Sequence, residues 1–506
     1  MRQNQVILCS GILLFSMAVL LLQHPSLAQA QLMAGAAKID VTHPTQLPIN
    51  DRLYVRALVL QNVKTRAVII SIDAVAIGEI GPINNDYLPT VRTAIQTTHG
   101  IAPTNVMINA SHCHGIVCND VDQKTIEAVN QALSNLQPVN VGVAHGHEDR
   151  IMENRRLQMK DGTEIDVRHA YSLPPDDEVA SVGPVDSEIG VLRIDRQDGS
   201  VLAVLYNFAC HPIQGVPGGA NTADITGYAS RVIEENLSDG CIALFLQGCG
   251  GDINPIHYKD VHHPRHAEPL GNLLGLSTLR AIRSIKPEAD NRLQIINRTV
   301  ELPRADVAAK IIELENERLR LAQSFRGTSL NQKSFLQLMV KYGLHPDYPS
   351  LASHGYLHER AIGRSDLEQL DAENRRLMKA YLDNVLRMER LTRLNTNLEL
   401  LRRHQQKHLA ATQRAIKAEI LAIRVGGFVM TTFPGELTVR IGLRLKQRSP
   451  HPHTFVAGYT NGYLYYAPTT EQLRNRGNAQ EDSDCILASE WQATYEREAL
   501  NILSQL

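Results

Sequence analysis

Between Gln31 and about Leu302, strand-like and helix-like segments alternate along the chain. Short apolar runs rich in β-branched residues are typical of buried strands, and they lie at 57–63, 66–73, 105–110, 139–144, 188–195, 201–209, 241–248 and 292–302. Longer segments with apolar residues three to four positions apart lie among them, at 85–100, 124–138, 226–240 and 269–287. This alternation predicts an α/β fold.

Two turns indicate that the sheets are mixed rather than purely parallel. Asp198-Gly199 separates two apolar runs and predicts a hairpin, and Gly426-Gly427 does the same near the C-terminus. We therefore expect mixed β-sheets flanked by helices.

The stretch from about 305 to 418 has a different pattern. Residues 308–323 and 367–404 are charged, favour helix and contain almost no glycine or proline. One apolar stripe is formed by Leu370, Leu377, Tyr381, Val385 and Met388. We expect a long helical excursion packed on the domain, with a coiled coil or a lipid-facing lid as alternatives.

The first 30 residues have the pattern of a secretory signal peptide. Arg2 precedes an apolar core from about Val6 to Leu22, and small residues lead to an expected cut after Ala30. An uncleaved membrane anchor is the alternative. We expect a secreted or periplasmic protein with one domain over 31–506.

Composition excludes some classes of protein. The 506 residues carry a net charge of −2, which argues against a dedicated nucleic-acid binder. Six cysteines follow the signal segment without any Cys-x-x-Cys pair, so a structural zinc ribbon is not expected. An exported chain permits disulfides, but the spacing does not define their pairing.

The motif INASHCHG places two histidines at the end of an apolar run. If extended geometry persists, His112 and His114 share one side and Cys113 points to the other. Two imidazoles there suit a zinc site, in which one ligates and the other ligates or moves protons. Incidental surface histidines are the alternative.

Other candidates also follow strands. His211 ends the run VLYNFA, and a hydrogen-bonded structural histidine is its alternative. Glu436 follows a strand and a Pro-Gly turn, as a metal ligand or as a carboxylate near a helix N-terminus. The loop GCGGD has glycines that let another loop or a ligand approach closely. Clustered tyrosines at 459, 463, 465 and 466 more often pack than react. Together these features suggest a metallohydrolase with about three protein ligands and an open position.

Eight blocks, in order, resemble the neutral (non-lysosomal) ceramidase family. They are GAAKIDVT, ASHCHG, ENRR, NFACHP, ADITGYASRVIEE, LFLQGCGGDINP, TTFPGELTVRIG and AGYTNGYLYYAPTTEQ, spread from about Gly35 to Gln472. The resemblance implies a zinc ion that activates water to hydrolyse the amide of an N-acyl sphingoid base (ceramide). It covers the catalytic N-terminal domain, and we expect the small C-terminal β-domain of the family to be absent.

The resemblance also implies roles for single residues. His112, His211, Glu436 and Tyr466 look like the zinc ligands, and His114 like the neighbouring histidine that stabilises the reacting group. Arg155 resembles the substrate-orienting arginine, although Arg156 leaves a one-residue ambiguity.

Three departures concern the substrate side. Asn254 stands where the family usually has a serine, so it can donate a hydrogen bond to substrate but cannot be a nucleophile. The family's His-Thr-His-Ser-Gly-Pro is replaced by HCHGIVC, and Asn478 occupies the position of a later tyrosine.

Three functions therefore remain open from the sequence. The first is a zinc-dependent amidase acting on ceramide, a lipid-like substrate that would bring peripheral membrane contact. The second is a zinc hydrolase of another acyl amide, ester or peptide-like substrate. The third is a degenerate domain that binds zinc or lipid without turnover.

Overall fold

A large mixed sheet organises the body of the protein. The structure is a computed structural model and describes residues 31–167, 174–258, 260 and 262–506, so the predicted signal peptide lies outside the described residues. In spatial order the strands of this sheet are β12 (Ile242–Gln247), β11 (Val201–Phe208), β10 (Glu188–Arg196), β5 (Gln137–His147), β1 (Met33–Asp40), β2 (Tyr54–Gln61), β3 (Arg66–Ile72) and β4 (Val106–Ala110).

The sheet folds back on itself, so its two edge strands meet. Only the pairs β11–β12 and β3–β4 are parallel. The Gln247 N–H of β12 donates to Asn109 Oδ1 of β4 at 2.9 Å, and the Ser71 hydroxyl of β3 donates to the Phe245 carbonyl at 2.6 Å. The ends of β4 and β11, which lie far apart in strand order, are therefore brought to the same place.

Smaller sheets complete the body. One has the order β14 (Leu293–Pro303), β15 (Ala415–Val425), β16 (Phe428–Thr432) and β18 (Thr454–Ala457). Another has the order β8 (Glu164–Asp166), β7 (Arg156–Met159) and β9 (Val179–Val182). Two short pairs join β13 (Ile253–Pro255) to β6 (Met152–Asn154) and β17 (Glu436–Leu437) to β19 (Tyr466–Ala467).

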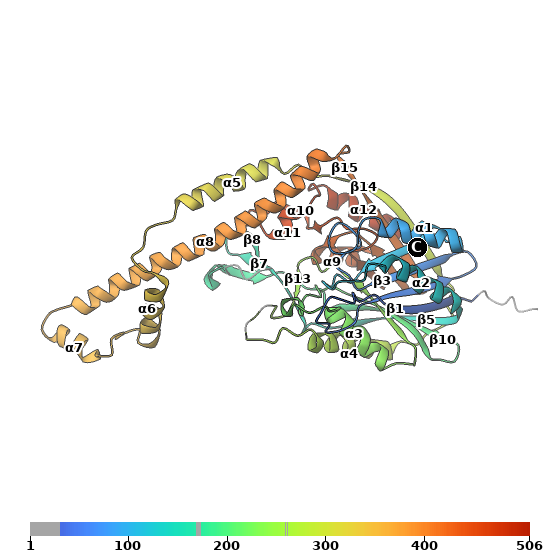
Figure 1. Ribbon diagram of the computed structural model, residues 1–506, viewed down its shortest axis with the longest axis horizontal. Coiled ribbons are helices and arrows are strands. Elements are labelled where there is room, and N and C mark those ends of the chain that lie inside the picture. Colours follow the sequence, from blue (N-terminus) through green and yellow to red (C-terminus); the bar gives the residue numbers. More distant parts are fainter. Residues whose placement is uncertain (1–30, 168–173, 259, 261) are drawn as a thin grey trace, which may run out of the picture.

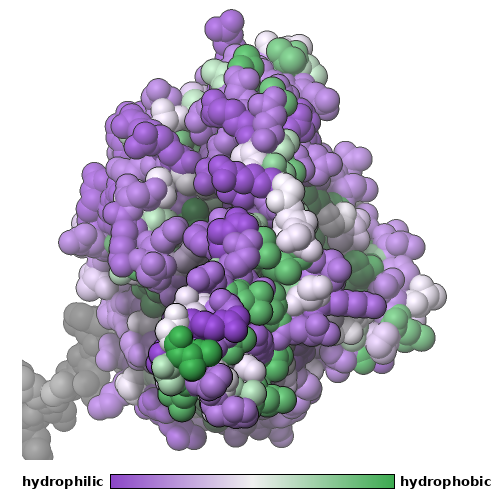
Figure 2. Space-filling view, turned by 90° about the vertical axis from the view of Figure 1, so that its left-hand side faces the viewer, coloured by the Kyte–Doolittle hydropathy of each residue, from purple (hydrophilic) through white to green (hydrophobic). Residues whose placement is uncertain are grey.

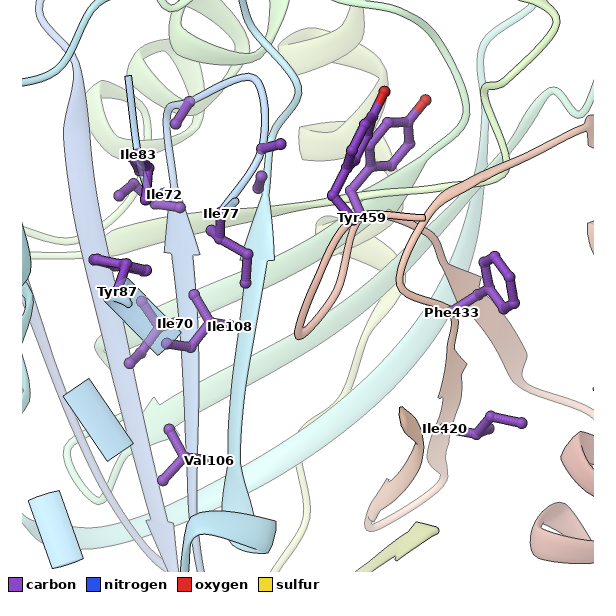
Figure 3. Close-up of a cluster of buried hydrophobic side chains, with 14 of the residues drawn as sticks. Ile70, Ile72, Ile77, Ile83, Tyr87, Val106, Ile108, Ile420, Phe433 and Tyr459 are labelled. Atoms are coloured by element: carbon purple, nitrogen blue, oxygen red, sulfur yellow. The ribbon is translucent and has the colours of Figure 1, made fainter. Parts of the chain in front are cut away.

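Helices cover the sheets and close three apolar cores. They are α1 (Tyr87–His99), α2 (Val121–Ser134), α3 (Asp224–Glu235), α4 (Glu268–Ser284), α9 (Val439–Arg448), α10 (Thr470–Leu473), α11 (Gln480–Ser483) and α12 (Trp491–Leu503). One core lies under α1 and α2 and continues to α12, a second lies between the two larger sheets, and a third lies under α3 and α4. Figure 3 shows part of the first core, from Ile70 and Ile108 to Tyr459 and Phe433.

The predicted helical excursion is an arm that projects from the body (Figure 1). It consists of α5 (Ala308–Gln323), α6 (Gln332–Leu344), α7 (Ser353–Ala361) and α8 (Asp366–Ala410). Leu314 of α5 packs against Leu394, Leu398 and Leu401 of α8 near the body. The arm is therefore not packed on the domain along its whole length, because only this root shares a core.

Most predicted elements are present, with two corrections. Both hairpins are confirmed, since β10 and β11 flank Gly199 and β15 and β16 flank Gly426, each glycine with a positive φ. The helix expected over 124–138 ends at Ser134, because Gln137 already pairs with Ala34 of β1. The expected stripe on α8 is only partly covered: Leu370 is 53% exposed and Met388 52%, whereas Leu377, Tyr381 and Val385 are half-buried.

Candidate metal centre

Three ligand-type side chains meet where the sheet edges meet. His112 follows β4, His211 follows β11 and Glu436 begins β17. Glu436 Oε2 lies 3.1 Å from His211 Nε2 and 3.6 Å from His112 Nε2, and the three ligand atoms lie within 4.8 Å of one another. Each residue is at most 2% exposed. Two neutral nitrogen donors and one carboxylate are a donor set typical of catalytic zinc.

Backbone carbonyls fix the orientation of both imidazoles. His112 Nδ1 lies 2.7 Å from the Val75 carbonyl, and His211 Nδ1 lies 3.0 Å from the Ile253 carbonyl. A carbonyl can only accept, so each Nδ1 carries a proton and each Nε2 is directed at Glu436. Each Nε2 can approach the carboxylate this closely through a proton or, in its place, through a metal ion. The residues therefore fit a divalent metal.

Burial and charge set the protonation states that metal binding needs. Burial lowers the pKa of His112 to about 4, so its imidazole is neutral near pH 7. Burial alone would raise the pKa of Glu436. The contacts with His112 and His211 and the hydrogen bond from Tyr463 outweigh burial and hold that pKa well below its usual value. His112 thus offers a neutral nitrogen to a metal ion, and Glu436 offers a full negative charge.

The backbone conformation that places His112 in the site was not predicted from the sequence. Its φ of +67° is in the left-handed region, which costs free energy for a residue with a Cβ. The extended geometry assumed for INASHCHG therefore ends at Ala110, the last residue of β4. His114 is nevertheless near, with its ring centre 5.5 Å from that of His112, and it is exposed at the cavity mouth.

Two tyrosines that the sequence treated as packing residues hold Glu436. The hydroxyl of Tyr459 donates to Oε2 at 3.1 Å and that of Tyr463 donates to Oε1. Burial, together with the charge of Glu436, raises the pKa of both phenols, so both remain donors. The sequence pattern that could have predicted this role is the spacing of the tyrosines around Thr460-Asn461-Gly462. At this turn the backbone approaches β4, and Asn461 Oδ1 accepts a hydrogen bond from the Ile108 N–H.

Tyr466 lies in the same cavity wall as the three ligands. It pairs with Glu436 through the parallel strands β19 and β17. Its hydroxyl is 3.3 Å from Arg155 Nη2, and the guanidinium lies 5.6 Å from the ring centre. Its assignment as a fourth ligand stays a prediction.

Of the two adjacent arginines, Arg155 is the one that faces the cavity. It is 1% exposed and paired with Glu481 at 2.7 Å, while its Nη2 also donates to the Gly251 carbonyl. Arg156 points instead to Glu164 and Asp482. The buried acid Glu481 was not singled out from the sequence.

Asn254 and Asn478 lie outside the metal cavity. Asn254 Oδ1 accepts a hydrogen bond from Arg155 Nη1 at 3.0 Å, so Asn254 supports the arginine and does not line the cavity. Asn478 lines a separate groove of about 910 Å³ between α8 and the small sheet, and its carbonyl accepts from Asn397.

The glycine loop does bring another loop close, as expected. A Cβ at Gly251 would lie 2.6 Å from the Glu436 carbonyl oxygen and 2.9 Å from that of Leu437. The Gly251 N–H donates to the Leu437 carbonyl at 2.9 Å. A side chain here would displace the strand that carries Glu436.

The cavity around the site has a volume of about 250 Å³. Its metal side is formed by the residues above, and Leu400 and Arg403 of α8 form part of the opposite wall. The apolar lining consists of Val75, Ile80, Ile213, Val216 and Leu400. The arm therefore contributes directly to the cavity through the C-terminal part of α8.

The cysteines beside the ligands are buried thiols. Cys113 and Cys210 are both free and at most 3% exposed, and burial raises the pKa of each. Neither forms a disulfide with another cysteine of the described residues. Neither belongs to the group of ligand-type atoms around Glu436.

Comparison with known proteins identifies the fold. No family model and no curated protein matches the chain. A crystal structure of neutral ceramidase from Pseudomonas aeruginosa is similar with a TM-score of 0.59 and 16% identity, over 94% of this chain and 75% of that one. A ceramidase complexed with C2 gives 0.58 and 16%, over 94% and 76%.

Fold and site together define an α/β protein with a buried His-His-Glu cluster at the meeting point of two sheet edges. This chain has the neutral ceramidase fold, as the resemblance of its sequence blocks predicted.

Proposed function

We propose that this protein is a zinc-dependent hydrolase that cleaves the amide bond of an N-acylsphingosine. The observation that carries the proposal is the convergence of His112 Nε2, His211 Nε2 and Glu436 Oε2 in a buried cavity. The fold shared with two ceramidase structures supports the reaction class. The proposal includes export, for which N-terminal sequencing of the mature protein should begin at Gln31.

The residues of this chain would divide the work as follows. His112, His211 and Glu436 would hold the metal, with Tyr466 as the proposed fourth ligand. Zinc supplies Lewis acidity, and it lowers the pKa of water from about 15.7 toward about 7. Arg155 keeps its charge in the cavity wall, where a donor to a developing oxyanion contributes roughly 3 kcal/mol. His114, at the mouth, is positioned to assist Arg155 or to deliver a proton to the leaving amine.

The cavity fits the reacting end of a lipid-like amide. Ligand pockets usually measure roughly 300–1,000 Å³, so a volume of about 250 Å³ suits the amide and its neighbouring carbons rather than two whole chains. The aliphatic part of the wall suits an acyl chain, while Arg403 and Asp484 give the same cavity polar groups for a headgroup.

The test measures metal content and turnover together. The wild-type protein should contain zinc by mass spectrometry and release fatty acid from N-acylsphingosine, and His112→Ala should lose both. His147→Ala, which changes an exposed histidine of β5, should keep both. A zinc-free wild type, or full activity in His112→Ala, would contradict the proposal.

A panel of acyl amides separates the remaining alternatives. If zinc binding depends on His112 but only amides with another headgroup are cleaved, the metal assignment stands and the ceramide assignment is wrong. If zinc is bound and no acyl amide is cleaved, the protein is a binding domain.

A further inference from the structure

The tip of the arm presents apolar side chains to solvent. Four of them follow one another at helical spacing on the outer face of α6, and the next loop and α7 add two more. These six residues form the tip patch: Leu336 (54% exposed), Met339 (49%), Val340 (60%), Leu344 (69%), Leu351 (101%) and Leu357 (57%). Figure 2, seen from the side of the arm's tip, shows apolar residues gathered among polar ones on this face. Such clustering is unusual on a soluble surface and marks an interaction site.

The inner face of α6 already has its partner. Phe335 stacks on Tyr381 of α8 with 4.6 Å between ring centres, and the Tyr342 hydroxyl donates to Asp371 at 2.8 Å. The residues of the tip patch on α6 are therefore not needed to hold the arm together. A helix that is apolar on a second face requires a second environment to bury it.

Two basic side chains of the tip, Arg326 and Lys333, lie beside the apolar residues in the sequence. Of the five lysines and arginines in residues 324–365, three are paired with acids at the start of α8: Lys341 with Asp371, Arg360 with Glu368 and Arg364 with Asp366. Lys333 and Arg326 are exposed and form no ion pair with any residue that the structure describes. Apolar side chains flanked by basic ones are typical of segments that lie at the surface of an anionic membrane.

We propose that the tip patch docks on the surface of a lipid bilayer that contains anionic lipids. The apolar side chains would enter the interface, and Lys333 and Arg326 would lie near the lipid phosphates. A second copy of this chain is a poorer partner, because Arg326 and Lys333 of one tip would repel the same residues of the other. None of the helices in the described residues is apolar enough over a sufficient length to cross a bilayer.

Docking at the tip is physically separate from the metal cavity. Along α8, 34 residues separate Asp366 at the tip from Leu400 in the cavity wall, or about 50 Å at about 1.5 Å per residue. Membrane binding and hydrolysis can therefore be measured independently, and failure of one leaves the other standing.

The experiment is co-sedimentation of the full chain with vesicles. Wild type should bind vesicles of phosphatidylcholine with about 30% phosphatidylglycerol more tightly than vesicles of phosphatidylcholine alone, and about 0.5 M salt should weaken this binding. Leu336→Asp/Val340→Asp should reduce the partition coefficient by about tenfold or more. The matched control is Leu276→Asp, a leucine of α4 with the same exposure (53%), which should bind like wild type.

A charge variant guards against a folding artefact. Arg326→Glu/Lys333→Glu leaves the apolar stripe intact and should weaken binding to anionic vesicles by about fivefold or more, while Arg283→Glu on α4 should not. Thermal unfolding of each variant should match wild type. Equal binding to both vesicle types, or unchanged binding in both tip variants, would overturn the proposal. So would a concentration-dependent dimer that Leu336→Asp/Val340→Asp abolishes in the absence of vesicle binding.

Discussion

At the scale of single residues, the geometry of the candidate metal centre depends on how Glu436 is restrained. Both of its carboxylate oxygens are engaged, Oε1 by Tyr463 and Oε2 by Tyr459 and His211. Partners that orient a ligand generally affect metal affinity nearly as much as the ligand itself. The two phenols thus define the direction in which the carboxylate can present its charge.

Removing one phenol should therefore weaken metal binding. Tyr463→Phe deletes the donor to Oε1 with little change in volume, and we expect zinc affinity to fall by about 10- to 100-fold in competition with a chromophoric chelator. Tyr206→Phe is the control, because Tyr206 is equally buried but bonds to Ser230 in a different core. Equal affinities of Tyr463→Phe and wild type would show that Glu436 needs no such restraint.

Asp51 is expected to make stability depend on pH. Burial, with the charges of Asp73 and Asp224, raises its pKa from 3.8 to about 7, despite hydrogen bonds from Thr222 and Ala223. The folded state then holds a proton that the unfolded chain has lost, so the stabilisation present below about pH 4 is lost as the pH rises through about 7.

Asp51→Asn should flatten this dependence. The decrease in unfolding free energy between about pH 5 and pH 8, measured with urea, should be smaller than in wild type. Some slope should remain, because burial also raises the pKa of Asp224, to about 6. Asp149→Asn, at an exposed carboxylate, should follow wild type. A slope in Asp51→Asn as steep as that of wild type would contradict the assignment.

The sequence predicted the residues at the centre better than their geometry. His112, His211 and Glu436 do converge, because each follows a strand whose end the fold brings to the same place. The left-handed backbone of His112 could not be predicted, since tertiary contacts impose it against local preference. The roles of Tyr459 and Tyr463 were missed because hydrogen bonds between distant loops leave no local pattern.

At the scale of elements, the arm is held by a short seam. Leu314, Leu394, Leu398 and Leu401 bury one another between α5 and α8, whereas beyond this seam α8 exposes Leu370, Leu382 and Met388. Periodicity located the helix but not its buried part, because the same spacing of leucines occurs in both halves.

Cutting the seam should loosen the arm and leave the body intact. Leu398→Ala removes a side chain that is 1% exposed, a change that typically costs about 2–5 kcal/mol. We expect faster limited proteolysis within 308–410 and little change in the melting of the body. Leu382→Ala, at a leucine 46% exposed, should be cleaved like wild type. Equal rates for the two variants would mean that the seam does not hold the arm.

At the scale of the whole molecule, most of the core lies away from the candidate metal ligands, although Tyr459 and Tyr463 of the first core bond to Glu436. Each of the three large clusters is closed by sheets and helices whose apolar residues do not depend on a metal. Strand and helix periodicity through 31–302 was enough to predict the α/β class, and the resemblance of the sequence blocks predicted the particular fold. The projection of the arm was not predictable from periodicity, which does not report what a helix packs against.

Metal removal should therefore lower the melting temperature without unfolding the protein. A ligand at about a hundredfold above its Kd stabilises by about 2.7 kcal/mol, so chelation should lower Tm and added zinc should restore it. Far-UV circular dichroism should stay unchanged after chelation. His211→Ala should show no zinc-dependent shift. A chelated protein that is unfolded at room temperature, or a wild type indifferent to zinc, would contradict this expectation.

The register of β14 and β15 has a consequence for modularity. Pro303, the last residue of β14, pairs directly with Ala415, the first of β15, and the Arg304 N–H still donates to the Arg414 carbonyl. In terms of topology the whole arm is the loop of one β-hairpin, so its insertion or deletion leaves every strand order intact. The tip of the arm can be exchanged without changing the metal cavity. The part of α8 near the body cannot, because Leu400 and Arg403 are part of the cavity wall. The outer end of the arm is thus free to vary, whereas its inner end forms part of the candidate metal centre.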